Sequence, residues 1–138
     1  MTMASDAVTP VTPTWPRKAA AATYAGVAGF QVALAAGAPW GVAAWGGAHE
    51  GVLPMGFRVG SVVSAGVWGL VAASLGTSWP PARWRRPVLT GLAVLAPVSL
   101  AMNLATPSPV ERAVWAPITA AQTVLVLLAF RAERRAAR

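Results

Sequence analysis

Four apolar segments, each about long enough to cross a lipid bilayer, constrain the fold of this 138-residue chain more than any other feature. The segments lie at about 19–38, 59–77, 88–105 and 113–130, and no acidic or basic side chain occurs inside them. A helix rises about 1.5 Å per residue, so roughly 18–20 residues extend about 27–30 Å, which matches the hydrocarbon core of a bilayer. We therefore predict an all-α membrane protein, a bundle of four transmembrane helices.

The composition of the chain agrees with extensive contact between its surface and lipid. Charged residues make up 11% of the chain and hydrophobic residues 56%. A soluble domain has about 25% charged residues, so this chain has too few charges to cover a surface that faces water. Contact with lipid is the simplest explanation for the missing polar surface.

The basic residues predict how the helices are oriented in the membrane. Of the 11 Lys and Arg residues, 2 fall in 1–18, 3 in 78–87 and 4 in 131–138. Because positive residues concentrate in short cytoplasmic segments, we expect both chain ends to be cytoplasmic. The predicted organisation is a disordered cytoplasmic tail at 1–18, a four-helix transmembrane domain at 19–130 and a basic cytoplasmic tail at 131–138.

The same charge distribution distinguishes between two kinds of anionic partner. The net charge is +7, but the arginines flank the apolar segments and do not line one helix face as a nucleic-acid-binding surface requires. We expect no nucleic-acid partner, and we expect the cytoplasmic arginine clusters to contact anionic lipid headgroups. The expected location is the cytoplasmic (inner) membrane of a bacterium, which the chain crosses several times.

A second interpretation of the first apolar segment stays open. Arg17 and Lys18 precede it, and Ala36-Gly37-Ala38 at its end matches the small-residue cleavage site of a secretory signal peptide. The segment is long for the apolar region of a signal peptide, so we expect it to be retained as a helix.

Small residues spaced four apart predict close packing between the first two helices. Examples are Ala25 and Gly29 in the first segment and Ala65 and Gly69 in the second. Such spacing lets helix backbones approach each other in lipid, although a genomic bias toward Ala and Gly explains the same pattern. The fourth segment is the most lipid-like, and we expect it to face the bilayer or a second copy of the protein in a homo-oligomer.

The loop between the first two apolar segments has the highest density of residues able to bind or react. Trp40 and Trp45 suit either the membrane interface, where an indole buries its ring and keeps its N–H in water, or a ligand-binding surface. His49 and Glu50 could act as a catalytic acid and base, although a hydrated loop histidine fits the sequence equally well. Arg58 could hold the loop or bind an anionic headgroup.

Six polar residues lie inside the predicted helices and share a depth in the membrane. Given the predicted orientation, all of them fall in the outer half of the bilayer or near its midplane. Polar groups in hydrocarbon must find partners, so we expect them to face inward and form a polar pocket beneath the 38–58 loop. Hydrogen bonds between helices are the alternative for each residue taken singly. The six are Gln31, Ser61, Ser64, Asn103, Thr119 and Gln122.

Several classes of site are disfavoured by what the chain lacks. It has no cysteine and one histidine, so we expect no disulfide, no metal site and no cofactor. All four acidic residues are expected outside the membrane-spanning segments, which disfavours a proton-coupled exporter. These residues are Asp6, Glu50, Glu111 and Glu133.

Parts of the loop resemble a group of small integral membrane proteins of actinobacteria and other bacteria. The resemblance rests on Ala38-Pro-Trp-Gly41, Ala44-Trp-Gly-Gly47, Leu53-Pro54, Arg58 and Ser61. It implies the four-helix layout, and it implies that the loop and the start of the second helix form one unit. The group has no established activity, so the resemblance implies none.

Three functions remain open at the level of sequence. We favour a small polytopic membrane protein that binds a lipid-like or amphipathic ligand, or a partner helix, in the outer pocket. The alternatives are a membrane-embedded isomerase or hydrolase of a lipid-soluble substrate, with His49 and Glu50 as acid and base, and a dimeric small-molecule transporter. The residues expected to bind the ligand are Trp40, Trp45, Arg58, Gln31, Ser61, Ser64, Asn103 and Gln122.

Overall fold

The computed structural model describes residues 14–138, and this part of the chain is helical apart from short connections. The long helices are α1 (Trp15–Ala36), α2 (Met55–Gly76), α3 (Ala82–Ala105) and α4 (Pro109–Ala136), and two 3-10 turns, η1 (Gly41–Ala43) and η2 (Trp45–Gly47), lie between α1 and α2. All four long helices are long and apolar enough to cross a membrane, which confirms the prediction of a four-helix membrane protein. Of the tail predicted at 1–18, residues 1–13 lie outside the described range, and residues 15–18 belong to α1.

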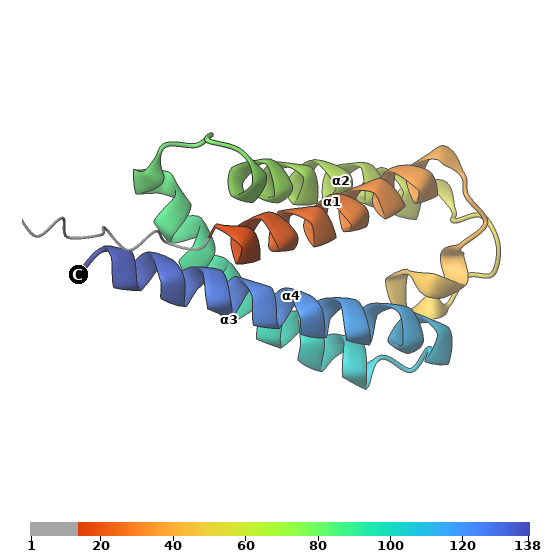
Figure 1. Cartoon of the computed structure of the whole chain (residues 1–138). Coiled ribbons are helices and arrows are strands. Elements are labelled where there is room, and N and C mark those ends of the chain that lie inside the picture. The colour runs from red at the N-terminus through yellow and green to blue at the C-terminus, as the bar shows by residue number, and fades with distance from the viewer. Residues whose placement is uncertain (1–13) are drawn as a thin grey trace, which may run out of the picture.

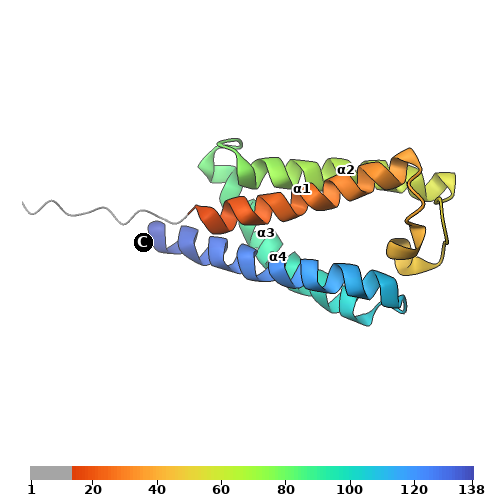
Figure 2. The same ribbon diagram turned by 45° about the vertical axis from the view of Figure 1, so that its right-hand side comes forward.

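The helices form two antiparallel hairpins, α1 with α2 and α3 with α4 (Figure 1). α1 also packs against α4, whereas α2 and α3 pack little against each other. The C-terminus, the start of α1 and the connection between α2 and α3 lie at one end of the bundle, which we call the arginine-rich end. At the opposite end, the loop end, the hairpins separate and the segment that joins α1 to α2 lies between them (Figure 2).

All four helices begin before the apolar segments that predicted them. They start at Trp15, Met55, Ala82 and Pro109, in place of 19, 59, 88 and 113. Hydropathy reports the part of a helix that contacts lipid, whereas the first residue of a helix depends on its cap and on proline. Pro109 is a favourable first residue for α4, and the Ser108 hydroxyl accepts a hydrogen bond of 3.2 Å from the N–H of Glu111. Glu111, which was expected outside the helix, therefore lies in its first turn.

The larger of two buried apolar clusters lies toward the arginine-rich end and joins all four helices. A Cβ added to Gly76 would lie 3.3 Å from the Cβ of Ala21, so α1 and α2 approach closely there. α1 and α2 pack closely, as predicted, but Gly29 and Gly69 are not contact points, because a Cβ added at either glycine would meet nothing within 4 Å. The buried members of this cluster are Ala20, Ala21, Tyr24, Leu75, Leu89, Leu92, Val126 and Ala129.

A smaller apolar cluster lies at the loop end. It consists of Leu34, Ala44 and Leu53, with Phe30 and Phe57 packed against them. Next to it, Arg58 donates from Nε to the carbonyl oxygen of Ala35 at 2.9 Å. This bond satisfies one of the carbonyls left without a partner at the C-terminal end of α1. The loop and the start of α2 are thereby attached to the end of α1.

We predict that Leu75→Ala lowers stability much more than Leu70→Ala. Leu75 is 0% exposed, whereas Leu70, on the same helix, is 63% exposed. Truncating Leu75 leaves a cavity and should cost about 2 kcal/mol, the low end of the usual range, because unfolded helices in a membrane still contact lipid. Thermal unfolding of the purified variants in lipid nanodiscs measures the difference. Equal melting temperatures would contradict the packing of the larger cluster.

Candidate ligand-binding site

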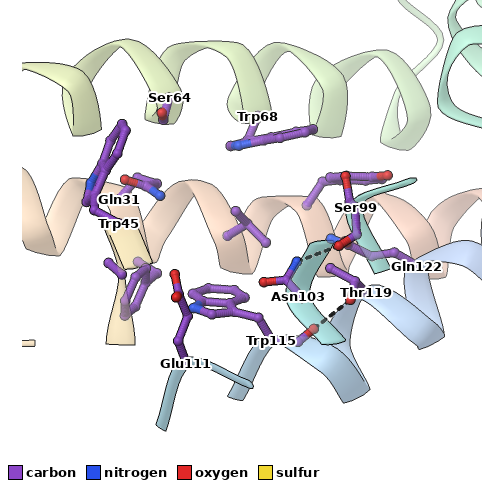
Figure 3. A pocket seen from close by; sticks show the side chains of 14 residues that line it. Gln31, Trp45, Ser64, Trp68, Ser99, Asn103, Glu111, Trp115, Thr119 and Gln122 are labelled. Carbon is purple, nitrogen blue, oxygen red and sulfur yellow. Dashed lines mark hydrogen bonds between the residues drawn. The ribbon is translucent and has the colours of Figure 1, made fainter. Parts of the chain in front are cut away.

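A cavity of about 280 Å³ lies between the two hairpins, and side chains from all four helices and from the loop line it (Figure 3). Tyr24 of the larger apolar cluster and Ala44 of the smaller one both line it, so the cavity occupies the space between the clusters. Its walls combine aromatic rings with polar groups. The aromatic residues are Tyr24, Phe30, Trp45, Trp68 and Trp115, and the polar residues are Gln31, Ser64, Ser99, Asn103, Glu111, Thr119 and Gln122.

The aromatic residues contact one another across helices. Trp68 of α2 stacks on Tyr24 of α1 with the ring centroids 5.3 Å apart. Trp115 of α4 meets Phe30 of α1 edge to face, with the centroids 4.8 Å apart. Both are favoured arrangements of aromatic pairs. Tyr24 and Phe30 of α1 are thus each paired with a tryptophan from a different helix, and these four rings line the cavity.

The ring of Trp45 packs against the start of α2. Its indole N–H donates to the hydroxyl of Ser61 at 3.2 Å, and Ser61 is fully buried. A Cβ added to Gly60 would lie 3.1 Å from the Trp45 ring, so a glycine at this position gives the indole room. Trp45 therefore lines the cavity through its ring, while its only donor is used by α2.

Hydrogen bonds from α4 hold the connecting segment across the loop end. The Trp115 indole N–H donates to the carbonyl oxygen of Ala43 at 2.6 Å, and the Ser108 hydroxyl donates to the carbonyl oxygen of Val42 at 3.2 Å. We call the segment 41–47 the roof. Because these bonds join the connection of the first hairpin to the second hairpin, the roof covers the loop end of the cavity.

Among residues 14–138, Glu111 is the one charged residue that lines the cavity. Its Oε1 accepts from the N–H of Gly46 in the roof at 3.2 Å, and its Oε2 accepts from the hydroxyl of Thr106 at 2.6 Å. The neighbouring Arg112 is exposed and donates to the carbonyl oxygen of Thr106 at 2.6 Å. Within residues 14–138 the one ion pair lies at the arginine-rich end, so no basic side chain of this range pairs with the Glu111 carboxylate.

Two glutamines in the cavity have buried polar atoms without a hydrogen-bond partner in the described part of the chain. These atoms are Gln31 Oε1 and Gln122 Nε2. Asn103 and Thr119 instead donate to carbonyl oxygens one turn earlier in their own helices, at 2.8 and 2.7 Å. The polar groups therefore do not pair with one another across the cavity. An unpaired buried polar atom costs about 1–3 kcal/mol, which a bound molecule can offset.

Most of the polar residues expected beneath the loop line this one cavity. They are Gln31, Ser64, Asn103, Thr119 and Gln122, and Trp45 joins them. Three other residues expected to bind the ligand, Trp40, Arg58 and Ser61, do not line it. Trp40 is exposed and stacks on Phe30 with the centroids 5.9 Å apart. The contacts of these three residues hold the loop in place.

His49 and Glu50 are not brought to the cavity. The His49 ring lies 4.7 Å from the ring of Phe57, and Glu50 is exposed. No ion pair joins them in the range 14–138. Catalysis by these two residues as acid and base stays a prediction.

Glu111, Trp68 and Trp115 were missed as site residues. The Ser108-Pro-Val-Glu111 segment has the spacing of a helix capping box, a pattern that would have placed Glu111 in the first turn of a helix. No local pattern identifies the two tryptophans, because their position at the cavity depends on how the hairpins pack.

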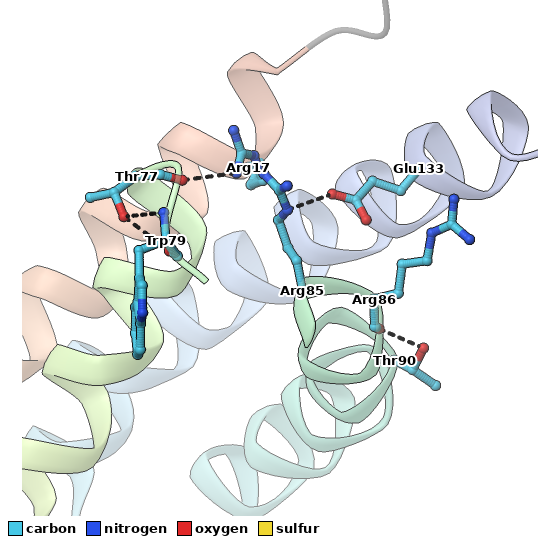
Figure 4. A network of polar contacts seen from close by, with 7 residues as sticks. All are labelled: Arg17, Thr77, Trp79, Arg85, Arg86, Thr90 and Glu133. Atoms are coloured by element: carbon cyan, nitrogen blue, oxygen red, sulfur yellow. Dashed lines mark hydrogen bonds and ion pairs between the residues drawn. The ribbon is translucent and has the colours of Figure 1, made fainter. Parts of the chain in front are cut away.

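A second cavity, of about 460 Å³, lies at the arginine-rich end between α3 and α4. Its lining includes the basic residues Arg86, Arg134 and Arg138 and the apolar residues Leu89 and Phe130. Glu133 also lines it and pairs with Arg85 at 3.6 Å, while Arg17 donates to the carbonyl oxygen of Thr77 at 3.3 Å (Figure 4). Three of the arginines at this end thus surround a partly apolar cavity.

No family model, curated protein or solved structure matches this chain. In the part of the chain that the structure describes, no group of three or more His, Asp or Glu side chains could hold a metal ion. The function therefore has to be inferred from the chemistry of the cavities.

We predict that Gly47→Ala opens the roof and that Gly46→Ala does not. Both glycines have a positive φ, of 69° and 83° respectively, so alanine adds similar backbone strain of roughly 1–2 kcal/mol at each. At Gly47 the new Cβ would also collide with the side chain of Ser108, whereas at Gly46 it would meet nothing within 4 Å. Hydrogen–deuterium exchange of the roof amides should be faster in Gly47→Ala. Equal exchange in the two variants would refute the contact between roof and α4.

Proposed function

We propose that this protein binds a small amphipathic, lipid-like molecule in the cavity at the loop end of its bundle. Gln122 carries this proposal, because it is 4% exposed, lines a cavity of about 280 Å³ and has no hydrogen-bond partner for Nε2 within residues 14–138. A buried amide group without a hydrogen-bond partner is unfavourable for stability alone. A ligand with a polar group at that depth would satisfy it.

The lining of the cavity suits an amphipathic ligand better than a fully polar one. Aromatic rings and Val27 offer apolar surface, and a few polar side chains are placed to fix an orientation, which is the usual composition of a small-molecule pocket. Small-molecule pockets have volumes of roughly 300–1,000 Å³, so this one is at the lower end of the range. We infer that the ligand is a small molecule or the headgroup of a lipid with a short chain, since a whole phospholipid would not fit inside.

The side of the bundle between α2 and α3 offers a route from the lipid. These two helices pack little against each other, yet Trp68 of α2 and Asn103 of α3 line the same cavity. The roof covers the loop end, and the larger apolar cluster fills the bundle toward the arginine-rich end. A ligand that partitions into the bilayer would therefore reach the cavity laterally.

The distribution of charge supports a location in the bacterial cytoplasmic membrane with the arginine-rich end in the cytoplasm. In this orientation the cavity lies in the outer half of the membrane. Arg86, Arg134 and Arg138 would then contact anionic lipid headgroups at the cytoplasmic surface, with Phe130 against the start of an acyl chain.

We predict that Ser64→Trp abolishes ligand binding and that Val63→Trp does not. Ser64 lines the cavity, so an indole at this position would fill it, whereas Val63 is 64% exposed and an indole there would lie in lipid. The assay is isothermal titration of the protein in phosphatidylcholine nanodiscs, with empty nanodiscs subtracted. The probes are three octyl compounds that differ in the charge of the headgroup: octyltrimethylammonium, 1-octanol and octyl sulfate.

The proposal requires saturable binding of at least one probe by the wild type and by Val63→Trp. Loss of this binding in a folded Ser64→Trp variant, checked by helical content and melting temperature, locates it in the cavity. Equal binding by both tryptophan variants would place it elsewhere and refute the proposed function.

A further inference from the structure

We propose that the polar end of the ligand is an organic cation, either a protonated amine or a quaternary ammonium group, held between Glu111 and the aromatic rings of the cavity. This inference rests on the proposed function and names the class of ligand. Three properties of the lining lead to it: its hydrogen-bonding capacity, its charge and its π surfaces.

The first property is that the two indole donors nearest the roof are already used by the protein, whereas a carboxylate acceptor lines the cavity beside them. The indole N–H groups of Trp45 and Trp115 are both used by the protein, in bonds to Ser61 and Ala43. The amide N–H of Asn103 is likewise used within its own helix. Gln31 Oε1 has no hydrogen-bond partner within residues 14–138, and the Glu111 carboxylate, which lines the cavity, can accept further hydrogen bonds. A ligand that donates hydrogen bonds or carries positive charge complements such a surface.

The second property is the negative charge that Glu111 brings to the cavity. Its carboxylate has two hydrogen bonds but no ion pair with a basic side chain in the described range, and every other residue that lines the cavity is uncharged. A cationic group bound beside this carboxylate would form a charge-assisted hydrogen bond or an ion pair with it. An anionic headgroup would be repelled, which argues against a fatty acid or a phosphate ester.

The third property is the amount of aromatic surface next to the carboxylate. Figure 3 shows the Glu111 side chain and the Trp115 ring pointing into the same part of the cavity, with Trp45 nearby in the roof. The faces of aromatic rings attract cations, and indole does so most strongly. The combination of one carboxylate with several rings recognises alkylammonium groups, which are both charged and apolar.

The lining deeper in the bundle fits the rest of such a molecule. Tyr24, Val27 and Trp68 offer apolar contact for a short chain, and the amide nitrogen of Gln122, which has no partner within residues 14–138, remains available to donate a hydrogen bond. A hydroxyl, ether or carbonyl oxygen in the chain would accept that hydrogen bond. The inferred ligand is therefore an amphiphilic amine with a short apolar body.

The comparison of the three octyl probes tests this inference. In wild-type protein we expect octyltrimethylammonium to bind about ten- to a hundredfold more tightly than 1-octanol, the factor expected for an interaction with a charged partner. We expect octyl sulfate to bind more weakly than 1-octanol. The nanodiscs contain only zwitterionic phosphatidylcholine, so the membrane surface does not concentrate either ion.

The matched variants are Glu111→Gln and Glu50→Gln. The first keeps an acceptor for the Gly46 N–H and removes the charge at the cavity, so the preference for the cation should disappear while 1-octanol binds as before. Glu50 is exposed and does not line the cavity, so neutralising it should leave the preference unchanged. If Glu111→Gln does not fold, the relative affinities of the three probes for the wild-type protein test the ligand class by themselves.

Two results would overturn the inference, and they are distinguishable. If 1-octanol or octyl sulfate binds as tightly as the cation, or if folded Glu111→Gln keeps the preference, the assigned ligand class is wrong while the proposed function stands. If none of the probes binds saturably to wild-type protein, the proposed function fails and the inference fails with it.

Discussion

The hydrogen bonds between the roof and α4 are the contacts on which the cavity depends. Two helix hairpins in lipid have little hydrophobic reason to close on each other, so packing and hydrogen bonds decide their separation. The larger apolar cluster joins them toward the arginine-rich end. At the loop end the bonds from Trp115 to Ala43 and from Ser108 to Val42 attach the roof to the second hairpin. The roof thus joins the hairpins while it lies between them.

Several residues that line the cavity also hold the roof. Trp115 donates to it, Glu111 accepts from it, and Trp45 belongs to it. A ligand in contact with these side chains would therefore stabilise the roof, and a displaced roof would remove part of the binding surface. Binding and the order of the roof are expected to be coupled for this reason, without a change in the packing of the larger apolar cluster.

The main features of the fold follow from hydropathy, and so does the depth of the polar residues. Four charge-free segments predict four helices, and the polar residues Gln31, Asn103 and Gln122 line one cavity. Asn103 lies near the loop end of α3 and Gln122 near the middle of α4, so the cavity extends along the bundle. Glu111 was misplaced because hydropathy marks the lipid-facing part of a helix and not its capped first turn. His49 and Glu50 were predicted as a catalytic pair because they are adjacent and can exchange protons, but neither lines the cavity. Side-chain directions in a glycine-rich loop depend on tertiary contacts, which the sequence pattern does not predict.

The most direct test of the account is an experimental structure of the protein isolated in lipid from the membrane in which it was made. We expect density for a small molecule in the cavity, in contact with the Glu111 carboxylate and within hydrogen-bonding distance of Gln122 Nε2. A collapsed cavity in which Gln31 and Gln122 are hydrogen-bonded to each other would contradict it.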